Sequence, residues 1–338
     1  MCRTPALGGH LYQCNSCNKL HYRYHSCRNR HCPNCQNTQT QQWIEARKDE
    51  VLPTQYFHVV FTIPDVLNQY CLRFPRQLYH LLFKSAWETL FTLGWNHKYL
   101  GAQLGATMVL HTWGQNLSLH PHIHCIVPGG GVGFNGKWKN KKAVGKYLFP
   151  VQVMSKVFRG KFIAAFKQIL LNLDEVYTYQ LNQALYHKDW VVYCKPPFNG
   201  ARGAIEYLAR YTHKIAISNH RILSIIGNVV TIKYKDYRHG GKSKLLKLKK
   251  PEFIRRFSLH ILPKGFTRIR HYGILSGRIK YQLFPQFKKQ QPIGWEEFWK
   301  KMELPLNKCN YCKNGILILI GTIPKRGPPI LIDVSISQ

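Results

Sequence analysis

The sequence predicts an α+β protein in which helices pack on a largely antiparallel sheet, preceded by a small cysteine-rich module. Runs of β-branched and aromatic residues are typical of buried strands, and segments with helical periodicity fall between them without a regular strand–helix–strand alternation. Cysteines and histidines are concentrated in residues 1–40, and this concentration predicts the separate module. At 338 residues the chain has room for about two domains.

The first half of the chain carries the clearest strand and helix signals. A helical pattern over residues 38–52 links the cysteine-rich module to the main domain. Residues 56–63, stopped by Pro64, predict a buried strand. Residues 66–97 predict two helices, broken near Phe74-Pro75.

The elements that follow are mixed in type, which favours an antiparallel sheet over a parallel one. The predicted strands and helices are strand 106–113, strand 122–127, helix 151–171, strand 189–194, helix 202–212, strand 228–234 and a strand in the apolar run 315–320. We therefore divide the chain into a module at residues 1–45, a main domain at residues 50–285 and a C-terminal tail at residues 286–338.

The charge balance identifies the class of partner. The chain has 49 Lys and Arg against 15 Asp and Glu, a net charge of +34. Such an excess favours a polyanionic partner and excludes a cationic substrate. No apolar run is long enough for a membrane span, and the N-terminus lacks a signal-peptide core. Clustered CxxC pairs favour metal binding in a reducing cytoplasm over secreted disulfides.

The cysteine spacing predicts a structural zinc site. Cys14 and Cys17 form one CxxC turn, and Cys32 and Cys35 form another. Two such turns complete a tetrahedral zinc site that is closed, and so folds the module rather than catalysing. Cys27 lies between the turns and is an alternative ligand. A third CxxC, at residues 309–312, is either a half-site completed elsewhere or a degenerate remnant.

Two further pairs suggest chemistry on phosphodiesters. His122 and His124 lie on one side of a predicted strand, where they could hold a divalent cation, although such pairs also arise by chance. Tyr207 and Tyr211 share one face of a predicted helix in a basic region. Simple aromatic packing is the alternative. Together the pairs fit a metal-polarised phosphate attacked by a tyrosine, which gives a 5′-phosphotyrosine and a free 3′ hydroxyl.

At this level of detail the chain resembles the HUH-type two-tyrosine transposases of bacterial rolling-circle insertion sequences, which carry an N-terminal zinc-binding domain. The segments that carry the resemblance are Ala6-Leu7-Gly8-Gly9-His10, Ser26-Cys27-Arg28-Asn29-Arg30-His31-Cys32-Pro33-Asn34-Cys35, Leu119-His120-Pro121-His122-Ile123-His124-Cys125, Glu206-Tyr207-Leu208-Ala209-Arg210-Tyr211-Thr212-His213 and Phe266-Thr267-Arg268-Ile269-Arg270-His271-Tyr272-Gly273. They occur in family order over most of the chain.

The resemblance implies a set of roles. His122 and His124 would ligate Mg²⁺ or Mn²⁺, and Tyr207 and Tyr211 would be the nucleophiles. The substrate would be single-stranded DNA at transposon ends and targets in the bacterial cytoplasm, and the fold an HUH endonuclease sheet. A third metal ligand is also implied. Our leading choice is His58, and the alternatives are His111, His120, His213 and Gln115.

Other functions remain to be weighed against a transposase. A replication-initiator or mobilisation nickase would share the chemistry. The chain begins almost at the zinc module, where the family usually has a further stretch, so a truncated DNA-binding remnant without catalysis is another alternative. A three-carboxylate transposase is disfavoured by the scarcity of acidic residues.

The basic segment 233–278 predicts a groove that tracks phosphates. Aromatic residues interleaved with its basic ones could stack on bases, although core packing is the simpler expectation for most of them. These aromatics are Tyr234, Tyr237, Phe253, Phe257 and Phe266.

Overall fold

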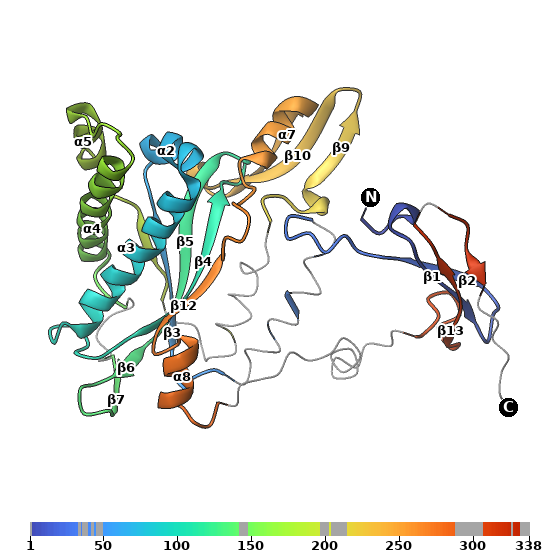
Figure 1. The fold of residues 1–338 in the computed structure, drawn as a ribbon, viewed down its shortest axis with the longest axis horizontal. Coiled ribbons are helices and arrows are strands. Elements are labelled where there is room, and N and C mark those ends of the chain that lie inside the picture. The colour runs from blue at the N-terminus through green and yellow to red at the C-terminus, as the bar shows by residue number, and fades with distance from the viewer. Residues whose placement is uncertain are drawn as a thin grey trace. The chain divides into compact units, whose positions relative to one another are not determined.

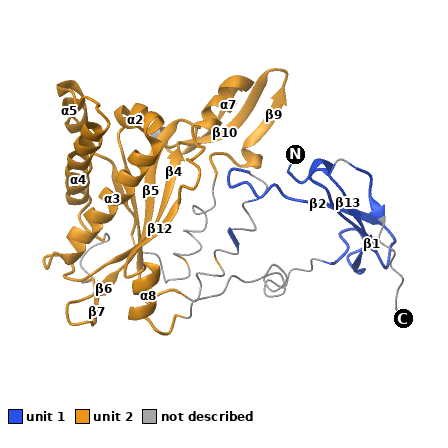
Figure 2. Cartoon of the chain, in the orientation of Figure 1, with its two compact units in different colours: residues 1–42, 290–338 blue, residues 43–289 orange. Residues whose placement is uncertain are grey.

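The computed structural model of the chain contains two compact units (Figure 2). Unit 1 comprises residues 1–42 and 290–338, and unit 2 comprises residues 43–289. The structure describes residues 2–32, 35, 40–41, 44, 50–141, 148–196, 203, 215–287, 307–325 and 327–331. Most of the helix predicted over 202–212, including both tyrosines, and most of that predicted over 38–52 lie outside these residues.

The described strands of unit 1 form one antiparallel sheet built from both ends of the chain. Its order is β14 (Ile330–Leu331), β13 (Leu317–Ile323), β1 (Gly9–Cys14) and β2 (Leu20–Tyr24). A short 3₁₀ turn, η1 (Pro5–Leu7), precedes β1.

The C-terminal tail that we predicted for residues 286–338 is therefore not a separate segment. The apolar run does form a strand, β13, which pairs with β1 from Gly9↔Ile323 to Cys14↔Leu317. The pairing satisfies the backbone donors and acceptors of β13 and buries Leu317 and Ile323. Residues at the two ends of the chain thus form one module.

Unit 2 is organised around a five-stranded antiparallel sheet of described strands (Figure 1). The order is β12 (Ile269–Gly273), β4 (Gly105–Trp113), β5 (Leu119–Pro128), β3 (Tyr56–Thr62) and β8 (Val192–Cys194). A small hairpin of β6 (Gly130–Val132) and β7 (Trp138–Asn140) follows β5. The predicted α+β class with antiparallel sheets is confirmed.

Helices cover one face of this sheet (Figure 1). After η2 (Asp65–Leu67) come α2 (Asn68–Arg73) and α3 (Pro75–Trp95), and later α4 (Val151–Asn172) and α5 (Tyr179–Tyr186). The break between α2 and α3 falls at Phe74, as predicted, because Pro75 fits the first turn of a helix but not its interior. Phenylalanines of α4 and leucines of α3 pack on β3, β4 and β5 to form the main core.

A smaller sheet extends unit 2 beyond the turn between β4 and β5. It consists of β9 (Ile222–Ile226), β10 (Val229–Asp236) and β11 (Lys242–Lys249), preceded by η3 (Asn219–Arg221), with η4 (Tyr237–His239) between β10 and β11. The helix α7 (Lys250–Ser258) follows it, and α8 (Gly277–Leu283) comes after β12. Val230, Ile232 and Leu248 bury one face against Leu117.

The edge strand β8 of the main sheet is shorter than the sequence predicts. The strand predicted over 189–194 begins only at Val192, because Trp190 instead turns into the core, where its indole N–H donates to the Leu185 carbonyl at 2.9 Å.

Three aromatic residues of the basic segment pack in the interior, as expected from core packing rather than base stacking. Phe253 and Phe257 pack on the core of the smaller sheet, and Phe266 is buried in the main core. In the part of the chain that the structure describes, no helix is long and apolar enough to cross a membrane.

Candidate active site

A group of histidines lies on the face of the main sheet opposite the helices. Along β5, Ile123 and Cys125 enter the helix-covered core, so the alternating residues His122 and His124 point to the other face. In the register with β4, His111 lies directly opposite His122. Period-two alternation and strand register thus bring the three imidazoles together.

The three imidazoles have the geometry of a metal site. One ring nitrogen from each of His111, His122 and His124 lies within 4.8 Å of the others. The Nε2 atoms of His122 and His124 are 3.1 Å apart. His111 and His124 are buried, whereas His122 is half-buried and leaves one side of the cluster open. Such a set could bind a divalent cation and still admit a phosphate oxygen.

Neighbouring groups fix the orientation of two of these rings. The Nδ1 of His122 lies 2.7 Å from the His120 carbonyl, to which it donates, so Nε2 is left to act as a ligand. The Nδ1 of His124 lies 2.8 Å from the Nε2 of His58, which stands on β3, and the two rings are stacked. These contacts are typical of the partners that orient metal-ligating histidines.

Burial favours the neutral form of two of the histidines in this region. Burial lowers the pKa of His58 to about 3 and that of His122 to about 4. Neutral imidazole is the form that binds metal, and both rings hold it throughout the neutral pH range.

His58, our leading choice for the third ligand, is not part of the three-histidine group. It lies behind His124 and contacts that ring, whereas His111, one of the alternatives, completes the group. The strand register explains why His111 and not His58 joins the group. In the β4–β5 pair, His111 lies opposite His122, whereas in the β3–β5 pair the residue opposite His122 is Thr62. The carbonyl of Gln115 accepts a hydrogen bond from Arg221, and His213 lies outside the described residues.

The two predicted nucleophiles, Tyr207 and Tyr211, also lie outside the described residues. Their roles stay a prediction from the sequence.

The eight cysteines of unit 1 are arranged differently from our prediction. Instead of one group of Cys14, Cys17, Cys32 and Cys35, the structure contains two groups of four. One consists of Cys14, Cys17, Cys309 and Cys312, and the other of Cys2, Cys27, Cys32 and Cys35. The pairing of β13 with β1 brings the C-terminal CxxC to Cys14, so the second N-terminal turn finds other partners.

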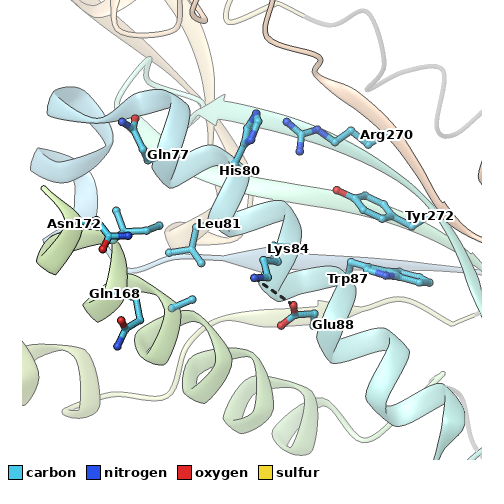
Figure 3. A pocket seen from close by; sticks show the side chains of 12 residues that line it. Gln77, His80, Leu81, Lys84, Trp87, Glu88, Gln168, Asn172, Arg270 and Tyr272 are labelled. Atoms are coloured by element: carbon cyan, nitrogen blue, oxygen red, sulfur yellow. Dashed lines mark ion pairs between the residues drawn. The ribbon is translucent and has the colours of Figure 1, made fainter.

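Figure 3 shows a pocket that lies on the other face of the main sheet, away from the face that carries the histidine group. Arg270 and Tyr272 reach into it from β12, and Lys84 and Trp87 reach into it from α3. Arg270 pairs in register with Met108, whose side chain lies in the core beneath the helices. The pocket therefore opens on the helix-covered side, and Tyr272 stacks on Trp87 at its edge.

Comparison with known proteins supplies the family. Residues 105–282 match the family model described as "Putative transposase", and residues 1–63 match a "Transposase zinc-binding domain". A putative transposase, y4qJ, of Sinorhizobium fredii is 39% identical over 99% of this chain and 90% of its own length. The transposase for insertion sequence element IS801 of Pseudomonas savastanoi pv. phaseolicola is 30% identical over 84% of this chain and 70% of its own. No solved structure matches the chain.

This chain, with its histidine group and its cysteine-rich module, is therefore a DNA transposase. The chain is a member of the insertion-sequence transposase family that carries an N-terminal zinc-binding domain, as the resemblance to HUH-type two-tyrosine transposases indicates.

Proposed function

We propose that this transposase nicks and religates single-stranded DNA through a 5′-phosphotyrosine intermediate, acting on transposon ends and targets in the bacterial cytoplasm. The observation that carries the proposal is the group formed by His111, His122 and His124, with its oriented rings and one open side. A structural role alone would not require three imidazoles to converge on one face of a sheet with one side left open.

The donor set indicates which cation fits. Imidazole nitrogen suits transition-metal ions, whereas Mg²⁺ prefers oxygen ligands. We therefore expect Mn²⁺ to bind more tightly than Mg²⁺. When bound, either ion would polarise the scissile phosphate and offset the charge that develops there.

Every bond that forms or breaks in the proposed step belongs to this chain or to the DNA. The hydroxyl of Tyr207 or Tyr211 loses its proton, its oxygen forms a bond to phosphorus, and the bond from phosphorus to the 3′ oxygen breaks. The 3′ oxygen takes a proton and leaves as a hydroxyl. Because the phosphodiester energy is kept in the tyrosine ester, a 3′ hydroxyl can reverse the step and join a strand. The second tyrosine could act on a second strand in the same way.

Exposed lysines on the smaller sheet are suited to hold the DNA backbone. Lys233, Lys235, Lys247 and Lys249 lie on the face of β10 and β11 that points away from the apolar cluster. By contrast, Lys244 pairs with Asp236 at 2.7 Å on the other face. The four lysines form part of the phosphate-tracking groove that we propose for residues 233–278.

Replacing these four lysines by glutamine should weaken single-strand binding and flatten its salt dependence. Each phosphate contact that is lost reduces the log–log slope of affinity against salt by about 0.7. Fluorescence anisotropy at several salt concentrations measures the slope. Lys156→Gln and Lys161→Gln, on α4, are the matched controls, and a slope unchanged by the four substitutions would remove this face from the DNA-binding surface.

The contact from His58 to His124 should affect metal affinity. His58→Phe keeps a ring in the buried position but removes the hydrogen bond at 2.8 Å. Loss of such a partner typically costs about 10- to 100-fold in metal affinity. Titration with Mn²⁺, followed by the electron paramagnetic resonance signal of the free ion, measures it. His80→Ala, at an exposed position on α3, is the control; equal affinities in the two variants would contradict the orienting role.

The chemistry of the cut ends tests the proposal. After cleavage and protease digestion, the upstream fragment should carry a 3′ hydroxyl that a polymerase extends, and the downstream fragment a 5′ end blocked by a tyrosyl peptide. A free 5′ phosphate would indicate hydrolysis and contradict the tyrosine mechanism. A nickase would leave the same ends, but the transposase relatives favour a role in transposition.

A further inference from the structure

The two CxxC turns of one cysteine group, at Cys14–Cys17 and Cys309–Cys312, have nearly the same backbone geometry. In the first, the backbone N–H groups of Ser16 and Cys17 donate to the Cys14 sulfur, both at 3.4 Å. In the second, the N–H of Tyr311 donates to the Cys309 sulfur at 3.4 Å. Backbone donors aimed at sulfur stabilise the thiolate form, which is the form that binds metal.

The residue after each turn confirms the equivalence. Asn18 and Lys313 both have positive φ values, 55° and 61°. Each donates its N–H to the carbonyl of the first cysteine of its own turn, in both cases at 3.0 Å. A left-handed conformation at a residue other than glycine is uncommon, so its occurrence at the same place in both turns indicates one shared structural motif.

The sheet brings the two turns together. Cys14 ends β1 and pairs in register with Leu317, which begins β13. In the resulting arrangement the Cys14 sulfur lies 3.7 Å from that of Cys312, and the Cys17 sulfur lies 3.6 Å from that of Cys309. Cys14 and Cys309 are buried.

These distances fit a metal ion and not disulfides. Four sulfurs bound tetrahedrally at about 2.3 Å from a zinc ion stand about 3.8 Å apart. A disulfide would require about 2.05 Å.

The second group shares these features. The Cys35 sulfur lies 3.3 Å from that of Cys2 and 3.6 Å from that of Cys27, and the N–H of Cys27 donates to the Cys2 sulfur at 3.4 Å. Cys32 completes the group of four. Both groups offer four sulfurs to a single point.

We propose that the chain folds around two structural zinc ions, and that Cys309 and Cys312 provide half of the ligands of one of them. The zinc-binding family model ends at residue 63, so it does not contain these two ligands. Four protein sulfurs leave no open position for catalysis. This zinc instead links strand β13 to strand β1 through Cys14, Cys17, Cys309 and Cys312. Folding of the zinc module therefore requires residues from both ends of the chain.

Metal content tests the proposal on the full chain, purified under reducing conditions. Mass spectrometry of the metals should find two zinc ions per wild-type chain. The double variants Cys309→Ser/Cys312→Ser and Cys27→Ser/Cys32→Ser should each hold fewer than two. Cys71→Ala, which removes a buried cysteine of unit 2, should still hold two. One zinc in the wild-type chain, iron in place of zinc, or two zinc ions in the Cys309→Ser/Cys312→Ser variant would overturn the proposal.

A second measurement on the wild-type chain does not depend on how the variants fold. After exchange of zinc for ¹¹³Cd, the NMR spectrum should contain two resonances in the range of cadmium bound by four sulfurs. A single resonance, or shifts typical of fewer sulfur ligands, would contradict two sites of four cysteines. Neither measurement involves DNA, so its outcome is independent of the tyrosine mechanism.

Discussion

Replacing both Tyr207 and Tyr211 with phenylalanine is expected to abolish the covalent protein–DNA adduct while DNA binding persists. The substitution removes only the hydroxyl oxygens that would bond to phosphorus, and the lysine-rich face of β10 and β11 is unchanged. Incubation with labelled single-stranded DNA and Mn²⁺, followed by a denaturing gel, detects the adduct. Anisotropy measures the binding.

The single variants and one control sharpen this result. Tyr207→Phe and Tyr211→Phe alone should each leave some adduct if the tyrosines act on different strands. Tyr179→Phe, at an exposed position on α5, should leave the adduct unchanged. An adduct that persists in the double variant would show that neither tyrosine is the nucleophile.

His122→Ala is expected to reduce cleavage by at least about 10³-fold, and excess metal should not restore it. The substitution removes one of three imidazoles from the candidate metal site. Lewis-acid stabilisation of a phosphoryl transition state is worth several kcal/mol, and about 1.4 kcal/mol corresponds to a factor of ten in rate. Single-turnover cleavage of the same DNA at increasing Mn²⁺ concentrations measures the loss.

A matched control separates this effect from a general loss of histidine. His97→Ala, at an exposed position after α3, should leave the cleavage rate unchanged. Full activity of the His122→Ala variant would contradict the assignment of the metal site. Rescue at high Mn²⁺ would instead indicate that His111 and His124 hold the ion without it.

Local patterns were sufficient for much of the fold of unit 2. The buried strand before Pro64, the helix break at Pro75 and the strands that carry His111 and His124 all follow from short runs of residues. The strands β1 and β2 were missed because their half-buried patterns mix polar and aromatic residues. The helix expected near Tyr207 stays a prediction.

The candidate metal site shows where local patterns fail. The spacing of His122 and His124 predicts that they share a face, but no local pattern selects His111 over His58. Both lie on strands beside β5 and point to the same face as the pair. Only the strand register places His111 among the ligands and His58 behind His124.

The cysteines illustrate the same limit over a longer separation in sequence. Two neighbouring CxxC turns are a reasonable zinc site by spacing alone. The actual partner of the Cys14 turn comes from residues 309–312, after the whole of unit 2. Composition gives no signal for that pairing. The apolar run 315–320 does predict the strand that forms β13, but no local pattern identifies β1 as the strand with which it pairs.

The central claim is that a cation held by histidines supports attack by a tyrosine on single-stranded DNA. The most direct test is a denaturing gel of the purified chain with Mn²⁺ and 3′-labelled single-stranded DNA from the flanks of its encoding element. We predict a band with the mobility of protein plus DNA that disappears when the metal is chelated, and no such band with 5′-labelled DNA. Cleavage without a labelled protein band, or an adduct that is insensitive to chelation, would contradict the claim.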